Sequence, residues 1–214
     1  MARYTRAKGR INRRLGVLIY ENGGASRAFE KRGNQPPGMH TRGRRPSNYG
    51  KALQEKQKIK HYFGLGERQL RRYFAKATRM KGNTGENLLL ICESRLDNVV
   101  RRLGYTHTRP QARQGIADGH FRVNGQKVDK PSFMLRPGDV ITLKPKANVV
   151  NLYRSIVGTG VEGAGIEWGS FDSETFTATI SGEPGASDIS LPVCLLYTSP
   201  SPRDRTRSRM PSSA

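Results

Sequence analysis

Two arginines four residues apart, Arg109 and Arg113, carry the clearest chemical signal in this sequence. They follow Thr108, and Thr108-Arg-Pro-Gln111 is a typical helix start, because the threonine hydroxyl can accept a free backbone N–H and proline is tolerated in the first turn. Residues four apart share a helix face, so both guanidinium groups point the same way. Guanidinium groups match phosphate oxygens in pairs, so the spacing predicts a surface that binds a polyanion. The alternative is a charged helix face that only interacts with solvent.

The residues around this pair predict a small module that holds it in place. Ala112 and Ile116 are also four apart and predict a face nearer the core, and the helix is expected to end at Gly119. The next segment predicts a β-hairpin over 120–128, since Asn124-Gly125 suits a type I′ turn. Residues 140–143 predict a further strand.

The chain before this module predicts helices with charged outer faces. Residues 67–81 place apolar side chains at helical spacing, and arginines cover much of the remaining surface. Asn83, with Glu86 three residues later, resembles a capping box, and we expect one helix from there to about Leu103. Residues 33–50 predict an extended basic loop, and beyond residue 155 only 176–181 predict a strand. The aromatic residues at helical spacing are interpreted as core residues: Tyr62, Phe63, Tyr73 and Phe74.

The sequence contains no pattern that predicts catalysis, a cofactor or a metal site. Gly158, Gly160 and Gly163 spell a G-x-G-x-x-G motif, but no helical period follows it, as a dinucleotide-binding loop would require. The four histidines have no ligand spacing, and no cysteine precedes Cys92. We therefore expect a protein that is not an enzyme and that binds no cofactor.

Positive charge is concentrated in the first three quarters of the chain. The net charge is +21, but residues 1–154 alone carry 34 Lys and Arg against 10 Asp and Glu, whereas residues 155–202 carry six acids and no base. Such a field points to a polyanionic partner. We expect no membrane partner, because the chain has no apolar run of about 18 residues and no amphipathic N-terminal helix with a large apolar face.

Four blocks of the sequence resemble the bacterial-type family of small-subunit ribosomal protein S4. They are EKQKIKHYFGLGERQLRRYF (55–74), KGNTGENLL (81–89), RLDNVVRRLGYTHTRPQAR (95–113), and the VNG, KPSF and PGD motifs within 123–139. The likeness extends over roughly residues 1–193. The central module also occurs in pseudouridine synthases, tyrosyl-tRNA synthetases and a heat-shock RNA-binding protein, so ERQLRRYF and GNTGENLL are the blocks that single out the ribosomal family.

The resemblance implies an α+β fold, in which an S4-type RNA-binding module of two helices and a small antiparallel sheet is inserted into a helical domain. Residues 1–50 are expected to form a basic N-terminal extension or loop. Residues 51–93, with part of 155–193, would form the helical domain, and residues 94–154 the RNA-binding domain.

The resemblance also implies a function. The chain would be a structural constituent of the small ribosomal subunit, a primary 16S rRNA-binding protein that helps to nucleate assembly and contributes to translational accuracy. Its partners would be that RNA, neighbouring small-subunit proteins where mRNA enters, and for some members their own mRNA. The location would be cytoplasmic and ribosome-bound, bacterial or organellar in type. The alternatives are a pseudouridine-synthase-like RNA-modifying enzyme and a free-standing RNA chaperone with the same module.

The RNA-binding residues are predicted in two groups. Within the module the resemblance assigns them to motif positions on its RNA-facing side: Arg95, Arg109, Arg113, Arg122, Asn124 and Lys127. The basic segments before the module add the second group: Arg3, Arg10, Arg13, Arg14, Arg44, Arg45, Lys58, Arg68, Arg71 and Arg72. Asp97 also matches the motif, and we expect it to pair with an arginine or to cap backbone donors.

The chain departs from the family pattern at Cys194. Residues 194–214 are rich in Ser, Pro and Arg without any period, which is typical of a disordered segment. The segment resembles translated sequencing-adapter read-through, and we expect the native protein to lack it. The intact mass of the native protein tests this expectation, because a mass that includes these residues contradicts it.

Overall fold

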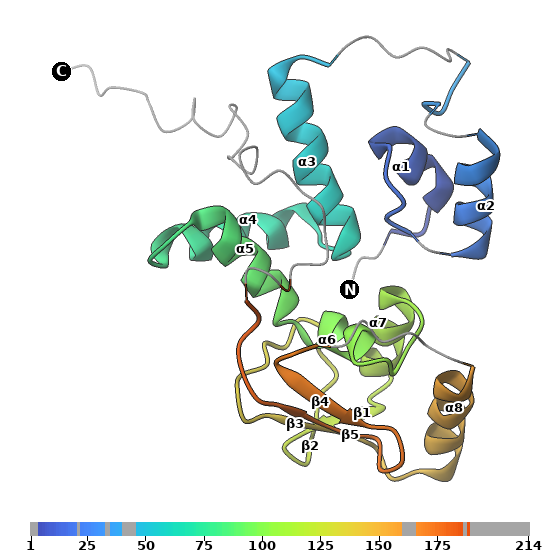
Figure 1. Cartoon of the computed structure of the whole chain (residues 1–214), viewed down its shortest axis with the longest axis vertical. Coiled ribbons are helices and arrows are strands. Elements are labelled where there is room, and N and C mark those ends of the chain that lie inside the picture. Colours follow the sequence, from blue (N-terminus) through green and yellow to red (C-terminus); the bar gives the residue numbers. More distant parts are fainter. Residues whose placement is uncertain are drawn as a thin grey trace. The chain divides into compact units, whose positions relative to one another are not determined.

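The computed structural model describes residues 4–20, 22–32, 35–39, 46–159, 166–185 and 188. The chain divides into two compact units, which are described separately below. The first comprises residues up to Glu67, and the second runs from Arg68 to residue 190. Figure 1 shows the elements of each unit in the colours of the sequence.

The first unit contains helices α1 (Lys8–Leu15), α2 (Gly23–Arg32) and α3 (Asn48–Tyr62). Ile11, Leu15 and Ile19 form a buried apolar cluster, against which Tyr62 packs. Helices α1 and α2 thus lie within residues 1–50, which the sequence assigns to a basic N-terminal extension or loop, and neither helix was predicted. Residues 40–45, in the middle of the predicted basic loop, lie outside the described residues.

The buried side-chain amide of Asn12 explains how the basic segment that contains α1 folds back on this helix. Asn12 is fully buried, and its Oδ1 accepts hydrogen bonds from the backbone N–H of Ile19 and Tyr20, at 3.2 and 3.1 Å. Its Nδ2 donates to the carbonyl of Tyr20 at 3.0 Å. These bonds turn the chain back on the helix and bring Ile19 onto the apolar face that Ile11 begins.

Helix α4 (Glu67–Arg79) starts at the last residue of the first unit and otherwise belongs to the second. The second unit also contains α5 (Thr84–Glu93), α6 (Leu96–Arg102), α7 (Arg109–Ala117) and α8 (Ala147–Gly158). The predicted helix over 67–81 and both predicted helix starts are confirmed. The Asn83 side chain accepts from the backbone N–H of Gly85, and the Thr108 side chain accepts from that of Gln111. Helix α8 was not predicted.

The prediction of one helix from Asn83 to Leu103 is wrong, because α5 and α6 are separated at Ser94 and Arg95. At this point the backbone forms hydrogen bonds with residues 131–135 and not only within a helix. The N–H groups of Leu96 and Asp97 donate to the carbonyls of Phe133 and Pro131, at 2.9 and 3.2 Å. The N–H of Leu135 donates to the Ser94 carbonyl at 3.0 Å. A separate helix therefore begins at Leu96.

Among the residues that the structure describes, the sheet of the second unit has five antiparallel strands in the order β2-β1-β3-β5-β4. They are β1 (Phe121–Val123), β2 (Gln126–Lys127), β3 (Val140–Leu143), β4 (Gly169–Asp172) and β5 (Thr177–Ile180). The hairpin prediction is confirmed: Asn124 and Gly125 both have positive φ, at 50° and 79°, as a type I′ turn requires. The predicted strand within 176–181 is β5.

Strands β4 and β5 extend the sheet of the predicted RNA-binding module. Strand β5 pairs with β3, with Ile141 opposite Ala178, and β4 pairs with β5. The sequence grouped a part of residues 155–193, without naming which, with the helical domain, and that grouping stays a prediction. Together with the helices, this sheet gives the predicted α+β fold.

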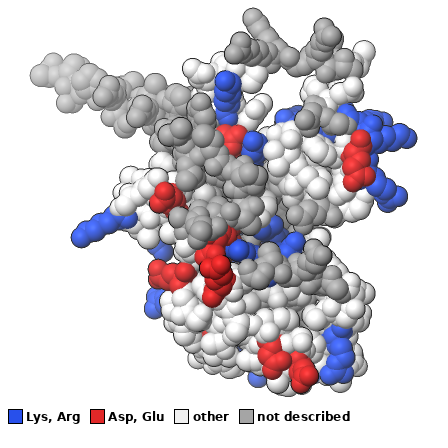
Figure 2. Space-filling model, viewed as in Figure 1, with Lys and Arg blue, Asp and Glu red and all other residues white. Residues whose placement is uncertain are grey.

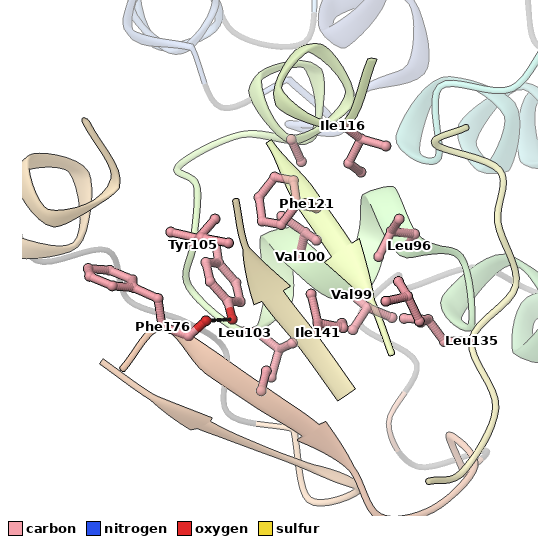
Figure 3. Packing of buried hydrophobic residues seen from close by; sticks show 14 of the residues in the cluster. Leu96, Val99, Val100, Leu103, Tyr105, Ile116, Phe121, Leu135, Ile141 and Phe176 are labelled. Atoms are coloured by element: carbon pink, nitrogen blue, oxygen red, sulfur yellow. Dashed lines mark hydrogen bonds between the residues drawn. The ribbon is translucent and has the colours of Figure 1, made fainter. Parts of the chain in front are cut away.

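The core of the second unit lies between the sheet and helices α6, α7 and α8 (Figure 3). It joins Val99 of α6, Ile116 of α7 and Phe121 of β1, all fully buried. Tyr105 crosses this core, and its hydroxyl donates to the carbonyl of Phe176 at 2.9 Å. Burial and the nearby Asp172 raise the pKa of Tyr105, so the hydroxyl stays a donor.

Candidate nucleic-acid interface

Helix α7 presents Arg109 and Arg113 as its sequence pattern predicts. Ala112 and Ile116 of the same helix are fully buried in the core, which fixes the rotation of α7. Arg109 and Arg113 are half-buried, so their stems pack while the helix keeps them near the surface. The structure thus brings the predicted pair together on one helix.

Each of these arginines contacts a different polar side chain of α6. The Nε of Arg109 donates to Oδ1 of Asn98 at 2.8 Å. The Nε of Arg113 lies 3.5 Å from Oδ2 of Asp97. The expected pairing of Asp97 with an arginine is therefore confirmed, and the role of Asn98 was not predicted. The only signal for Asn98 in the sequence was its type, since asparagine is unfavourable inside a helix.

Arg95 does not belong to the surface, and its prediction as an RNA contact is corrected. Its side chain is 1% exposed and donates to both carboxylate oxygens of Asp97, from Nε at 3.0 Å and from Nη2 at 2.6 Å. Its Nη1 donates to the Tyr73 hydroxyl at 2.7 Å. Although burial disfavours its charge, Asp97 and then Tyr73 raise the pKa of Arg95, so it stays a cation inside the fold.

The hairpin places two cations opposite each other. Arg122 of β1 is the cross-strand partner of Lys127 of β2, and Lys127 is exposed. Like charges directly opposite each other in a sheet are destabilising. An anion bound between the two side chains would attract both and offset their mutual repulsion. This pair therefore favours a polyanionic ligand.

Lys127 also lies against the C-terminal end of α7. A Cβ built on Gly119 would stand 3.1 Å from Nζ of Lys127 and would overlap its Cε. Gly119 therefore gives this lysine room beside the helix, and a helix C-terminus favours a cation. The hairpin thus places one cation beside the end of the helix that carries Arg109 and Arg113.

Asn124 has a structural role in the hairpin turn. Its Oδ1 accepts from the backbone N–H of Val140 at 2.9 Å, and its Nδ2 donates to Asp139 at 2.9 Å. Both polar atoms of this side chain connect the hairpin turn to the start of β3. The residue is exposed, so its predicted contact with RNA stays a prediction.

The predicted basic residues outside the module divide into three groups. Five are exposed: Arg10 and Arg14 on α1, and Arg68, Arg71 and Arg72 on α4. Two are engaged within the first unit, because Arg13 donates to the carbonyls of Gln35 and Pro36 at 3.0 and 3.1 Å, and Lys58 pairs with Glu55 at 2.7 Å. Arg3, Arg44 and Arg45 lie outside the described residues.

Basic side chains gather on the helices of the first unit. Figure 2 shows Lys and Arg over the region of α1 and α2, and α2 alone contributes Arg27, Lys31 and Arg32. In the described part of the chain, no group of three His, Cys, Asp or Glu is placed to hold a metal ion. No helix among the described residues is long and apolar enough to cross a membrane.

Comparison with known proteins decides the family. Residues 3–93 match the family model of the ribosomal protein S4/S9 N-terminal domain, and residues 94–141 match that of the S4 domain. The small ribosomal subunit protein uS4 of Rhodopirellula baltica is 66% identical over 193 residues, which are 90% of this chain and 95% of that protein. The chain belongs to the uS4 family.

Other uS4 proteins are more distant but are covered to the same extent. The uS4 of Persephonella marina is 43% identical and that of a Thermoanaerobacter species is 42% identical, each over 198 residues, 90% of this chain and 95% of the relative. The uS4 family match includes residues 3–93, the part that precedes the shared module. An RNA-modifying enzyme or a free-standing chaperone built on that module is therefore not favoured.

Proposed function

We propose that this uS4-family chain is a structural constituent of the small ribosomal subunit that binds 16S rRNA directly and is not an enzyme. The observation that carries the proposal is the α7 arginine pair, Arg109 and Arg113, which α6 holds near the surface of a module that matches the S4 domain. The relatives at 66% and 43% identity are named as small ribosomal subunit proteins, which supports the same role.

The chemistry of the module suits a folded RNA. Duplex and junction RNA is bound mainly through shape, phosphates and 2′-hydroxyls, for which a rigid platform with several cations is appropriate. The α7 pair and the opposed Arg122 and Lys127 provide four cations on packed elements. Asn124 and Asp139 brace the hairpin that carries two of them.

We further propose the finer parts of the role that the family resemblance implies. The chain would be a primary binder that helps to nucleate assembly of the subunit body and contributes to translational accuracy. It would contact neighbouring small-subunit proteins where mRNA enters, and in some settings its own mRNA. It would act in a cytoplasm or organelle of bacterial type, bound to the ribosome.

Replacement of the α7 pair tests the proposal. Arg109→Ala with Arg113→Ala removes two charge-assisted contacts, and we expect affinity for 16S rRNA to fall by roughly tenfold to a hundredfold. The loss of affinity with rising salt should also become less steep. For each phosphate that the variant no longer neutralises, the slope of log affinity against log salt should fall by about 0.7–0.9. Affinity can be measured by filter binding over a potassium chloride series, with the fold checked by circular dichroism.

A matched control removes the same charge elsewhere in the unit. Arg136→Ala with Arg154→Ala removes two exposed cations, one before β3 and one on α8. We expect it to retain affinity within about threefold, since only long-range attraction is reduced. Equal reductions of affinity in the two double variants would show that the α7 pair acts only through net charge and would contradict a specific interface.

A further inference from the structure

A line of buried polar side chains lies behind Arg109. Its first member is Asn98, which is 1% exposed and accepts the Nε–H of Arg109 at 2.8 Å. On its other side, Nδ2 of Asn98 donates to the carboxylate of Glu93 and, at 3.3 Å, to the Glu93 carbonyl. Asn98 therefore connects an arginine near the surface to the interior of the unit.

The line continues to the other end of α6. Glu93 is fully buried, and its Oε2 accepts from Nη1 of Arg102 at 3.2 Å. The same Nη1 donates to the carbonyl of Asp188 at 2.7 Å. Because Arg102 is itself buried, the Glu93 carboxylate is held in one place by a paired charge and cannot easily turn away from Asn98.

This arrangement fixes which way the Asn98 amide faces. An amide oxygen turned toward the Glu93 carboxylate would be repelled, whereas the amide nitrogen donates to it. The oxygen must then face Arg109. Glu93 thus determines that Asn98 offers an acceptor, and not a donor, to the arginine.

The acceptor is neutral, which has a consequence for binding an anion. A carboxylate in the place of Asn98 would hold Arg109 equally well but would cancel much of its charge. The amide oxygen accepts from the guanidinium without placing a negative charge beside it. Arg113 differs, because it contacts the Asp97 carboxylate, whose charge is already balanced by the bidentate Arg95.

We propose that Asn98 is a positioning residue for RNA binding: it holds Arg109 in its binding orientation before RNA arrives, and Glu93 sets the direction of its amide. This inference rests on the proposed function. An arginine that is already ordered loses less conformational freedom when it binds a phosphate. The affinity for RNA therefore rises although no new contact is made. Asn98 itself touches no RNA.

The first test needs no RNA. In the full chain, nuclear magnetic resonance relaxation of the arginine Nε–H groups should give Arg109 an order parameter near 0.85, typical of rigid backbone. The exposed Arg72 of α4 serves as the internal reference, with a value below about 0.6. An Arg109 that is as mobile as Arg72 would overturn the proposal.

The second test is a double-mutant cycle on RNA affinity, with 16S rRNA as the probe. We expect Asn98→Ala to weaken binding about threefold to tenfold, and Arg109→Ala about tenfold. The combined variant should bind like Arg109→Ala alone, within about twofold, because Asn98 acts only through that arginine. Additive effects would overturn the proposal, since they would assign Asn98 a separate role in fold or contact.

Two controls keep these outcomes interpretable. Asn151→Ala makes the same replacement at an exposed position of α8 and should leave affinity unchanged. If Asn98→Ala does not fold, the order parameter of Arg109 in the wild-type chain still decides the claim. If the wild-type chain shows no preference for 16S rRNA, the proposed function fails, while the relaxation measurement separately decides whether Arg109 is held in place before RNA binds.

Discussion

At the scale of single residues, arginines of one motif have different tasks. Arg95 and Arg113 both contact Asp97, but Arg95 is buried and bidentate, whereas Arg113 lies 3.5 Å from the carboxylate and retains surface. The sequence placed both in one RNA-facing set. What separates them is the position of Tyr73, whose hydroxyl accepts from Arg95 across 22 residues of sequence.

Removal of the buried cation should cost stability more than function. Arg95→Ala leaves the Asp97 carboxylate buried without most of its pairing, and we expect the free energy of unfolding to fall by about 3–5 kcal/mol. Chemical denaturation measures this change. Arg122→Ala on β1 provides the comparison, with an expected change within about 0.5 kcal/mol. An Arg95→Ala protein of unchanged stability that binds RNA poorly would restore Arg95 as a contact.

Glu67 gives the first unit a defined response to acid. Burial alone would raise its pKa, but hydrogen bonds from Lys56 and Lys60, at 2.6 and 2.9 Å, lower the pKa from 4.5 to about 2. Because the pKa is lower in the folded state, this carboxylate stabilises the fold above pH 4.5. That contribution is lost progressively as the pH falls toward 2.

The expected result is therefore a stability loss between pH 4.5 and 2 that depends on Glu67. Glu67→Gln should be less stable than the wild type at pH 6, and the two proteins should converge as the pH approaches 2. Thermal unfolding over a pH series measures this difference. A constant difference across that range would show that the ion pairs with Lys56 and Lys60 do not contribute.

At the scale of elements, the sequence predicted those helix starts and turns that are formed by hydrogen bonds between residues close in the chain. Thr108 predicts the start of α7 and Asn124-Gly125 predicts the hairpin, because the capping bond and the turn are made within a few residues. The division between α5 and α6 was missed because it depends on bonds from residues 131–135. Helix α1 was missed because the sequence does not show that Asn12 is buried and accepts from the backbone N–H groups of Ile19 and Tyr20. In the sequence it is only one more polar residue among basic ones.

The packing of α8 against α7 depends on one glycine. A Cβ on Gly115 would overlap the hydroxyl of Tyr153 and lie 3.3 Å from Cε2 of Phe121. Tyr153 is buried, and its hydroxyl lies 3.3 Å from Nδ1 of His120. Gly115 is therefore a position at which α7 has no room for a side chain beside α8.

We expect Gly115→Ala to lower the free energy of unfolding by about 1–3 kcal/mol, as overpacking of a core does. Adding Tyr153→Phe removes the overlapping hydroxyl and should restore most of that stability, which thermal unfolding can measure. Gly158→Ala, at the end of α8 with open space around it, serves as the control. If the second substitution restores nothing, the close approach is not the cause.

At the scale of the whole molecule, charge and fold point to the same partner. Residues 1–154 carry most of the positive charge, and they include α1, α4, α7 and the hairpin. Composition alone predicted a polyanion, and the family match to uS4 narrows the proposal to ribosomal RNA. Composition could not show which cations are held by the fold, because Arg13, Lys58 and Arg95 look the same in sequence as exposed ones.

Chemical footprinting of 16S rRNA with the full chain, over a potassium chloride series, tests the central claim most directly. We predict protection of one discrete junction in the small-subunit RNA, with affinity falling by about 0.7–0.9 log units per log unit of salt for each phosphate neutralised. Large-subunit RNA should show no such site. Diffuse protection along the 16S molecule, or tighter binding to large-subunit RNA, would contradict the account.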